Sequence, residues 1–230
     1  ILSYGERLST SLIAARAESQ GIETELLDSS KLIVTDDSFT NAQPDMHASA
    51  ERVRAQVHPR PGRLLVAQGF VGSTERGVTT TLGRGGSDYS ATIFGNILRA
   101  EEVQIWTDVH GIMTCDPRIV TEAVTIERIS YDEAAELAFF GAKVVHPYTI
   151  QPAVEHGIPV TVRNTRDPSH PGTRIEAESV ENGVRALAMK RGISLITVQS
   201  SRMLNAWGFL ERLFGVFARH RMSVDLVATC

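Results

Sequence analysis

The sequence has few cysteines and no long apolar run, and both absences narrow the class of protein. Its two cysteines, Cys115 and Cys230, lie far apart without metal-ligand spacing, which argues against a disulfide scaffold or a zinc site. No apolar run approaches the roughly 20 residues that a membrane-spanning helix needs. The N-terminus shows no signal or transit pattern. We therefore expect a cytoplasmic protein from a reducing compartment.

The sequence also has only a small excess of charge of one sign. The chain has 23 basic and 27 acidic residues, interspersed, and a formal net charge of −4. It contains no basic stripe, so neither nucleic acid nor an anionic membrane is expected as a partner. Hydrophobic residues make up 42% of the 230 positions, and a chain of this length can bury a core without disulfides or bound metal ions. The chain starts and stops in mid-pattern, which predicts a fragment of a longer protein.

Short β-branched runs alternate with helical patterns along most of the chain. The expected strands are 24–27, 64–68, 78–82, 103–107 and 158–162, and the expected helices are 9–19, 46–57, 89–99, 131–140 and one that ends at 156. This alternation predicts an α/β domain, a layered sandwich with a mostly parallel sheet.

A second pattern begins where the composition turns polar and acidic, around 176–185. A predicted strand at 193–198 precedes a helix with Phe209, Leu213 and Phe217 on one face, and a short strand follows at 224–228. This β-α-β order predicts the start of a small α+β domain. We place the boundary near Gly183, which gives domains 1–183 and 184–230.

A glycine-rich turn between a strand and a helix is the most informative stretch. Residues 79–88 read Thr-Thr-Thr-Leu-Gly-Arg-Gly-Gly-Ser-Asp. Glycines allow the backbone to turn sharply near a ligand, and the following helix N-terminus suits a phosphate or carboxylate. Arg84 adds donors that match a carboxylate. The plainer alternative is a tight turn with Ser87 or Asp88 as the helix N-cap and a solvated arginine.

The string from Thr81 to Asp88 resembles the aspartate kinase signature of the amino-acid kinase family. Four further blocks resemble the same family in the same order. They are Ser-Tyr-Gly-Glu at 3–6, Trp-Thr-Asp-Val-His-Gly at 106–111 with Asp-Pro-Arg at 116–118, Phe-Gly-Ala-Lys-Val-Val-His-Pro at 140–147, and Gly-Phe-Leu at 208–210 with Ser-Val-Asp-Leu at 223–226. The resemblance covers essentially the whole chain.

The resemblance implies an enzyme that transfers the γ-phosphoryl group of ATP to the side-chain carboxylate of L-aspartate. This is the first step in the biosynthesis of lysine, threonine and methionine. Arg84 would bind the α-carboxylate of aspartate and Glu6 its α-ammonium group, with Gly85 and Gly86 shaping the substrate turn. Asp88 would organise the cationic groups around the phosphoryl group, and Ser87 would supply a hydroxyl. Taken alone, Glu6 could instead be an ordinary first-turn acid of a helix.

The resemblance also implies a nucleotide site at the carboxyl end of the strand 103–107. Thr107 and Asp108 would contact the ribose and base, while Arg118 and Lys143 would reach the phosphates. Met113 stands where relatives often have an aromatic residue, and its thioether can pack against a base. Alternatives remain for single residues: Arg118 could be an exposed charge after a plain turn, and Lys143 could cap a helix. Mg²⁺ would arrive with ATP.

The segment after Gly183 resembles the start of an ACT domain, a module that binds regulatory amino acids. By this resemblance a homodimer formed through ACT domains is expected, with lysine as the favoured effector. The effector-binding positions would be Met203, Gly208, Phe209, Leu210, Ser223, Val224 and Asp225. Two rival functions stay open: another kinase of the same family, or an amino-acid sensor without catalysis.

The resemblance further predicts that this chain alone is inactive. The family carries a catalytic lysine in a Lys-Phe-Gly-Gly motif on its N-terminal strand, and none of the 230 residues forms that motif. Losing one such charge-stabilising group can cost roughly 10²–10³ in rate.

Overall fold

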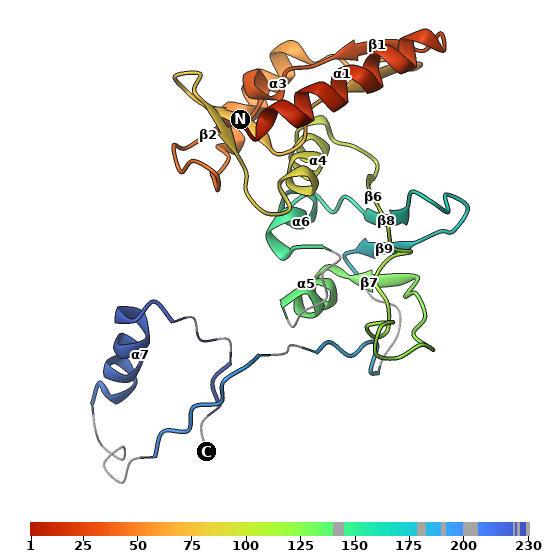
Figure 1. The fold of residues 1–230 in the computed structure, drawn as a ribbon. Helices are drawn as coiled ribbons and strands as arrows, with labels where there is room; N and C mark the ends of the chain where they lie inside the picture. Colours follow the sequence, from red (N-terminus) through yellow and green to blue (C-terminus); the bar gives the residue numbers. More distant parts are fainter. Residues whose placement is uncertain are drawn as a thin grey trace. The chain divides into compact units, whose positions relative to one another are not determined.

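The first unit, Ile1–Lys190, consists of three small sheets and the helices that pack against them (Figure 1). The second unit is Arg191–Cys230. The computed structural model describes residues 1–139, 145–178, 183–189, 192–199, 207–222, 224 and 226–228.

The N-terminal part of the first unit surrounds a small parallel strand pair. Helix α1 (Ser3–Ser19) leads into β1 (Glu23–Leu26), which pairs in parallel with β3 (Arg63–Val66). Between these strands lie α2 (Ser29–Leu32), β2 (Val34–Thr35) and α3 (Met46–Gln56). The Asp45 carboxylate caps α3 by accepting a hydrogen bond from the Ala48 amide at 3.0 Å. Such a cap stabilises a helix by about 1 kcal/mol.

A second sheet leads directly to the glycine turn. Its strand order is β2-β4-β5, with β4 (Val71–Thr74) and β5 (Thr79–Thr81) antiparallel. The chain then enters helix α4 (Gly86–Leu98). Apolar side chains from α3, α4 and neighbouring segments form one buried cluster, made of Leu32, Val53, Val57, Leu82, Ile93 and Ile97. This cluster holds the start of α4 against the strands before it.

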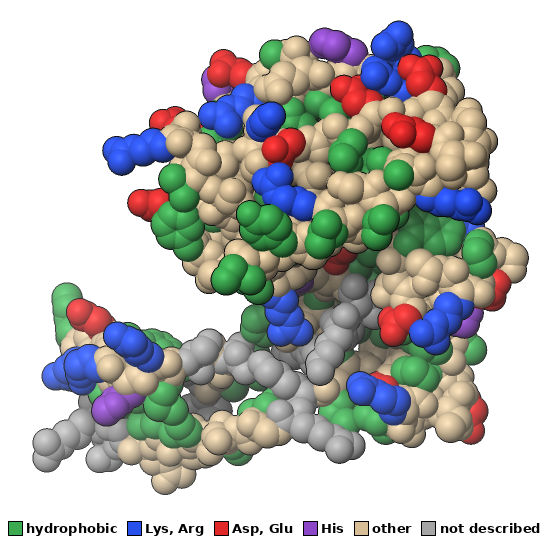
Figure 2. Space-filling view, turned by 45° about the horizontal axis from the view of Figure 1, so that its top comes forward, with side chains coloured by type: hydrophobic (Ala, Val, Ile, Leu, Met, Phe, Trp, Pro, Cys, Tyr) green, Lys and Arg blue, Asp and Glu red, His purple; other side chains and the backbone are tan. Residues whose placement is uncertain are grey.

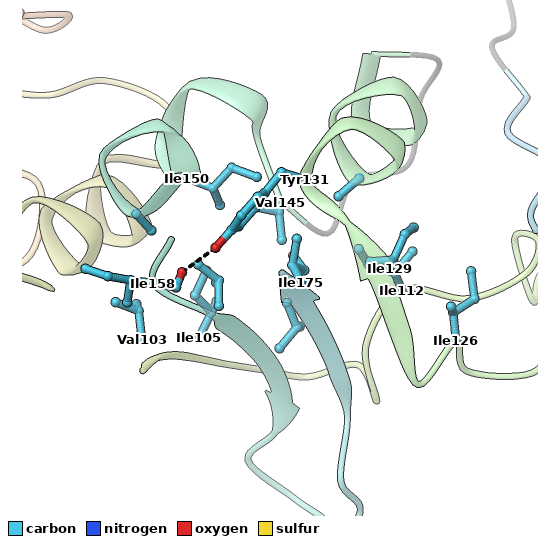
Figure 3. Packing of buried hydrophobic residues seen from close by; sticks show 14 residues of the cluster. Val103, Ile105, Ile112, Ile126, Ile129, Tyr131, Val145, Ile150, Ile158 and Ile175 are labelled. Carbon is cyan, nitrogen blue, oxygen red and sulfur yellow. Dashed lines mark hydrogen bonds between the residues drawn. The ribbon is translucent and has the colours of Figure 1, made fainter. Parts of the chain in front are cut away.

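The third sheet has the order β6-β8-β9-β7 and carries the larger core. Its strands are β6 (Val103–Thr107), β8 (Val160–Asn164), β9 (Thr173–Glu176) and β7 (Arg128–Ser130). Helices α5 (Tyr131–Phe139) and α6 (Pro147–Val154) pack beside it, as Figure 3 shows. Strands β6 and β8 are parallel, so their carboxyl ends lie at the same edge of the sheet.

We expect the Tyr131→Phe variant to lower the free energy of unfolding by about 1–2 kcal/mol. The Tyr131 hydroxyl donates a 2.7 Å hydrogen bond to the carbonyl oxygen of Ile158, and both residues are buried (Figure 3). Removing the hydroxyl leaves that buried carbonyl without this partner. Urea unfolding measures the change. The matched control is Tyr148→Phe, because 76% of Tyr148 is exposed; an equal effect at both tyrosines would contradict the prediction.

The predicted fold class is confirmed, but the described residues of the second unit do not form the predicted strands. Four of the six strand pairings in the first unit are parallel. In the second unit the described residues form α7 (Phe209–Arg219), while the described parts of 193–198 and 224–228 pair with no strand. A strand needs a neighbour to satisfy its backbone groups, and Leu195 is 92% exposed.

Residues 183–189 belong to the first unit and contact the rest of it, whereas the domain boundary near Gly183 stays a prediction. The Leu187 amide donates to the carbonyl oxygen of Thr114 at 2.9 Å. The Arg185 guanidinium donates to the carbonyl oxygen of Arg128 at 2.6 Å. In the structure the two units divide after Lys190. The assignment of the second unit to an ACT domain stays a prediction.

Charged side chains of both signs are interspersed on the face drawn in Figure 2. Among the helices in the described part of the chain, none is both long and apolar enough to cross a membrane.

Candidate functional site

The glycine turn requires glycine for two separate reasons. Gly83 and Gly85 adopt left-handed backbone angles, with φ of 79° and 69°, which side chains rarely allow. A Cβ atom at position 83 would also lie 2.5 Å from Asn41 Oδ1. Gly85 is the N-cap of α4, so the first-turn amides of this helix begin immediately after the turn. The Arg84 and Ser87 side chains are exposed at this helix end.

Glu6 and Ser87 meet at Gly69, a residue from a different segment. The Gly69 amide donates a 3.0 Å hydrogen bond to Glu6 Oε1. A Cβ atom at position 69 would lie 2.8 Å from Ser87 Oγ and 3.1 Å from Glu6 Oε1. Helix α1, the turn after β3 and the start of α4 therefore converge on one point. The resulting site combines a carboxylate, a hydroxyl and the exposed guanidinium-bearing turn.

Sequence reasoning did not single out Gly69 and Phe70. Phe70 has a φ of 46°, an uncommon angle for a residue with a side chain. Its amide donates to Ser90 Oγ at 2.9 Å, and its carbonyl oxygen accepts from the Leu82 amide at 3.0 Å. The available signal was the Gln-Gly-Phe step that ends an apolar run. Local sequence could not show which partners hold it.

Asp88 lies in the first turn of α4 and is partly buried. Desolvation by burial raises the pKa of the Asp88 carboxyl above its usual value.

We expect Asp88→Asn to raise the melting temperature of the ligand-free chain at pH 7. A carboxyl whose folded-state pKa is raised favours the fold at low pH, and this stabilisation is lost as pH rises through the folded-state pKa. The gain of Asp88→Asn should therefore shrink toward pH 3, below the usual pKa of about 3.9. Thermal unfolding between pH 3 and pH 8 measures it. Asp132→Asn is the matched control, since Asp132 is an exposed first-turn acid of α5; a stabilised control or a pH-independent gain would contradict the assignment.

The predicted nucleotide residues lie at and after the carboxyl end of β6. Thr107 ends this strand, and its carbonyl oxygen accepts hydrogen bonds from the Thr165 amide at 2.8 Å and hydroxyl at 3.0 Å. Asp108 follows and is exposed. Met113 pairs with Thr125 in the hairpin beyond. The role of these residues in nucleotide binding stays a prediction.

Arg118 has a specific partner rather than a fully solvated side chain. Its Nε and Nη2 atoms donate to the two carboxylate oxygens of Asp116 at 2.9 and 2.7 Å. The Asp116 side chain raises the pKa of the Arg118 guanidinium. The arginine is nonetheless largely exposed, so a phosphate could compete for the same donors.

Lys143 lies outside the described residues, but the chain just after it reaches the glycine turn. A Cβ atom at Gly85 would lie 2.8 Å from Thr149 Cγ2 and 3.7 Å from the His146 Cβ. The Thr92 hydroxyl of α4 also donates to the carbonyl oxygen of Thr149 in α6. The start of α6 is thus packed directly against the turn that carries Arg84.

The predicted effector residues are only partly described. Gly208, with a φ of 73°, precedes α7, and Phe209 and Leu210 open this helix. Val224 is exposed. Met203, Ser223 and Asp225 lie outside the described residues. The described part therefore shows the helix start but no effector pocket.

Metal-ligating side chains do not gather in the described residues. No group of three or more histidine, cysteine, aspartate or glutamate side chains there could hold a metal ion. Mg²⁺ that is bound together with a nucleotide commonly takes ligands from the phosphate oxygens and from water.

Comparison with known proteins gives consistent matches. Residues 1–164 match the model described as the amino acid kinase family. The lysine-sensitive aspartokinase 3 of Escherichia coli is 46% identical over 232 residues, covering 100% of this chain and 51% of that protein. The crystal structure of E. coli aspartokinase III with aspartate and ADP superposes with a TM-score of 0.85 at 45% identity, covering 99% of this chain and 52% of that one.

A crystal structure of E. coli aspartokinase III in complex with lysine and aspartate has a TM-score of 0.82 at 45% identity, covering 99% of this chain and 52% of that one. The chain spans about half the length of the curated E. coli relative that it matches.

Proposed function

Because this chain belongs to the amino acid kinase family, we propose that it supplies the substrate- and nucleotide-binding part of an aspartate kinase. The reaction is transfer of the γ-phosphoryl group of ATP to the side-chain carboxylate of L-aspartate. The observation that carries the proposal is the convergence of Glu6, Gly69 and Ser87 beside the turn that bears Arg84. Similarity to aspartokinases over the whole chain supports this choice of substrate.

The arrangement suits an amino acid because it offers one cation and one anion from separate elements. The Arg84 guanidinium binds the α-carboxylate, and the Glu6 carboxylate binds the α-ammonium group. The Gly85–Gly86 backbone allows close approach, and Ser87 provides a hydroxyl beside Gly69. A bound aspartate would thereby present its second carboxylate in a fixed direction.

Phosphoryl transfer then requires positioning and charge neutralisation more than covalent catalysis. An aspartate carboxylate oxygen attacks the γ-phosphorus as the bond to the ADP oxygen breaks, giving an acyl phosphate and ADP. Asp88 organises cationic groups near the transferred group. Thr107, Asp108 and Met113 hold the nucleoside, while Arg118 and Lys143 bind phosphates. Mg²⁺, when bound with ATP, neutralises phosphate charge.

The test is a set of titrations followed by an activity assay. Isothermal titration should detect binding of aspartate and ADP to the 230-residue chain, with glutamate much weaker. ADP release should require aspartate once the residues of E. coli aspartokinase III outside the matched region are joined to this chain. Glutamate-dependent release would favour another kinase of the family. Binding of aspartate without any nucleotide binding would favour a sensor.

We also propose that the second unit binds lysine as an effector and pairs with a second copy as an ACT domain. The E. coli structure that superposes on this chain holds lysine as well as aspartate, which supports the choice. Titration with lysine and with threonine identifies the effector. Sedimentation of the chain, saturated with each amino acid in turn, then shows whether two copies pair. Threonine binding without lysine binding would reject the choice of effector, and a monomer at all concentrations would reject the pairing.

A further inference from the structure

We propose that Ser90 is a positioning residue for the aspartate site: its hydroxyl ties the Gly69–Phe70 turn to the first turn of α4. The Gly69–Phe70 turn and the start of α4 both lie beside the Glu6 carboxylate. As far as the ligand is concerned, this inference rests on the proposed function. Ser90 itself lies one helical turn beyond the glycine turn and is not expected to contact any substrate.

Ser90 makes two hydrogen bonds in a buried place. Its Oγ donates to the Gly86 carbonyl oxygen at 2.9 Å and accepts from the Phe70 amide at 2.9 Å. Only 2% of the residue is exposed. The hydroxyl therefore satisfies a backbone amide that water cannot readily reach. One oxygen atom connects a turn after β3 with the helix that begins at the anion-binding turn.

The connected turn is held in a strained conformation. Phe70 has a φ of 46°, in the left-handed region that residues with side chains avoid. Its carbonyl oxygen is fixed by the Leu82 amide, and its amide is fixed by Ser90. When the Ser90 hydroxyl is removed, one of the two bonds that impose this angle is lost. The backbone of Phe70 can then relax.

Relaxation at Phe70 displaces the group that orients Glu6. The preceding residue, Gly69, donates its amide to Glu6 Oε1 at 3.0 Å and packs against Ser87. Phe70 also packs closely against the start of α4, because a Cβ atom at Gly86 would lie 2.6 Å from the Phe70 Cβ. A movement of Phe70 therefore also changes its contact with the helix start. A shift of the turn therefore changes the distance between the ammonium-binding carboxylate and the carboxylate-binding turn.

Four variants of the full chain test the inference. Ser90→Ala and the similarly sized Ser90→Cys remove the hydroxyl, and Ser90→Thr keeps it. The matched control is Ser49→Ala, because Ser49 is also buried and its Oγ accepts from the Val34 amide at 2.9 Å, in a different part of the unit. Aspartate and ADP titrations, together with urea unfolding, are measured for each.

We expect Ser90→Ala and Ser90→Cys to raise the dissociation constant for aspartate about tenfold, equivalent to 1.4 kcal/mol. The dissociation constant for ADP should change by less than about twofold, and Ser90→Thr should bind aspartate as the parent does. Ser49→Ala should lose stability but not aspartate affinity. Equal aspartate affinity in Ser90→Ala and Ser49→Ala, or failure of Ser90→Thr to restore it, would overturn the inference.

Amide hydrogen exchange tests the positioning role of Ser90 independently of whether the chain binds aspartate. Ser90→Ala should accelerate exchange of the Gly69 and Phe70 amides about tenfold more than Ser49→Ala does, with or without ligand. If the parent chain binds no aspartate, the proposed function fails, and the exchange rates alone decide whether Ser90 positions the turn. Equal exchange in the two variants would reject the positioning role.

Discussion

Replacing Arg84 by alanine should raise the dissociation constant for aspartate by about ten- to a hundredfold, because a charge-assisted hydrogen-bonded pair is lost. The side chain is exposed on the turn between Gly83 and Gly85, whose left-handed angles fix its backbone. Among the described residues it forms no ion pair, so its donors are available to a ligand. The affinity for ADP should change by less than about twofold.

Two further variants define what Arg84 contributes. Arg84→Lys keeps the charge but loses the planar fork, so we expect an intermediate dissociation constant. Arg76→Ala removes the same charge from an exposed turn between β4 and β5 and should leave aspartate binding unchanged. Isothermal titration measures all three. Normal aspartate affinity in Arg84→Ala would show that the glycine turn does not bind the substrate carboxylate.

The elements that support the site were predictable where their pattern is local. Strand β6 spans Val103–Thr107 as predicted, because a β-branched run stands between clear breaks. The glycine turn and α4 were also predictable, since three glycines followed by Ser87 and Asp88 allow few other structures. The predicted helix starts at 89 and at 9 were three and six residues too late, because first turns depend on packing and caps.

Strands β7 and β9 were missed because their pairing with each other is not local, and β4 was missed because a glycine interrupts its pattern. Strand β7 has three residues and pairs with β9, more than forty positions later in the sequence. Strand β4 contains Gly72, and glycine normally weakens a strand. A methyl group there would meet Thr35 Cγ2 at 2.9 Å, so the residue is required by a neighbour that the local sequence does not reveal.

In the candidate site, too, the residues of a short motif could be predicted, but contacts between distant segments could not. Arg84 and Ser87 are recognisable from one short string, and Glu6 from its own block. That Glu6 and Ser87 both meet Gly69 could not be predicted, because Glu6 lies 63 positions before Gly69 and the three residues come from three separate segments. Motifs indicate which chemistry is present, whereas turns such as Gly69–Phe70 decide the distances between the groups.

Replacing Gly111 by alanine should lower the free energy of unfolding by about 3 kcal/mol or more and weaken ADP binding. Gly111 has a φ of 133°, and a Cβ atom there would clash with Thr173 Oγ1 and lie 2.9 Å from the Thr173 amide nitrogen. Thr173 cannot give way easily, because it is fully buried. Its hydroxyl accepts from the Ile112 amide at 2.8 Å and donates to the Ile126 carbonyl oxygen at 2.6 Å.

These two hydrogen bonds join the ends of the hairpin that carries Met113 and Arg118, so the clash must shift the proposed nucleotide surface as well as the fold. Gly157→Ala is the matched control: its φ is 62°, yet a Cβ atom there would meet nothing within 4 Å. It should cost only the backbone strain, about 1 kcal/mol, and leave ADP binding unchanged. Urea unfolding and ADP titration of both variants measure the difference. Equal destabilisation would show that the Thr173 contact is not what requires glycine, and unchanged ADP affinity in folded Gly111→Ala would separate this hairpin from the nucleotide site.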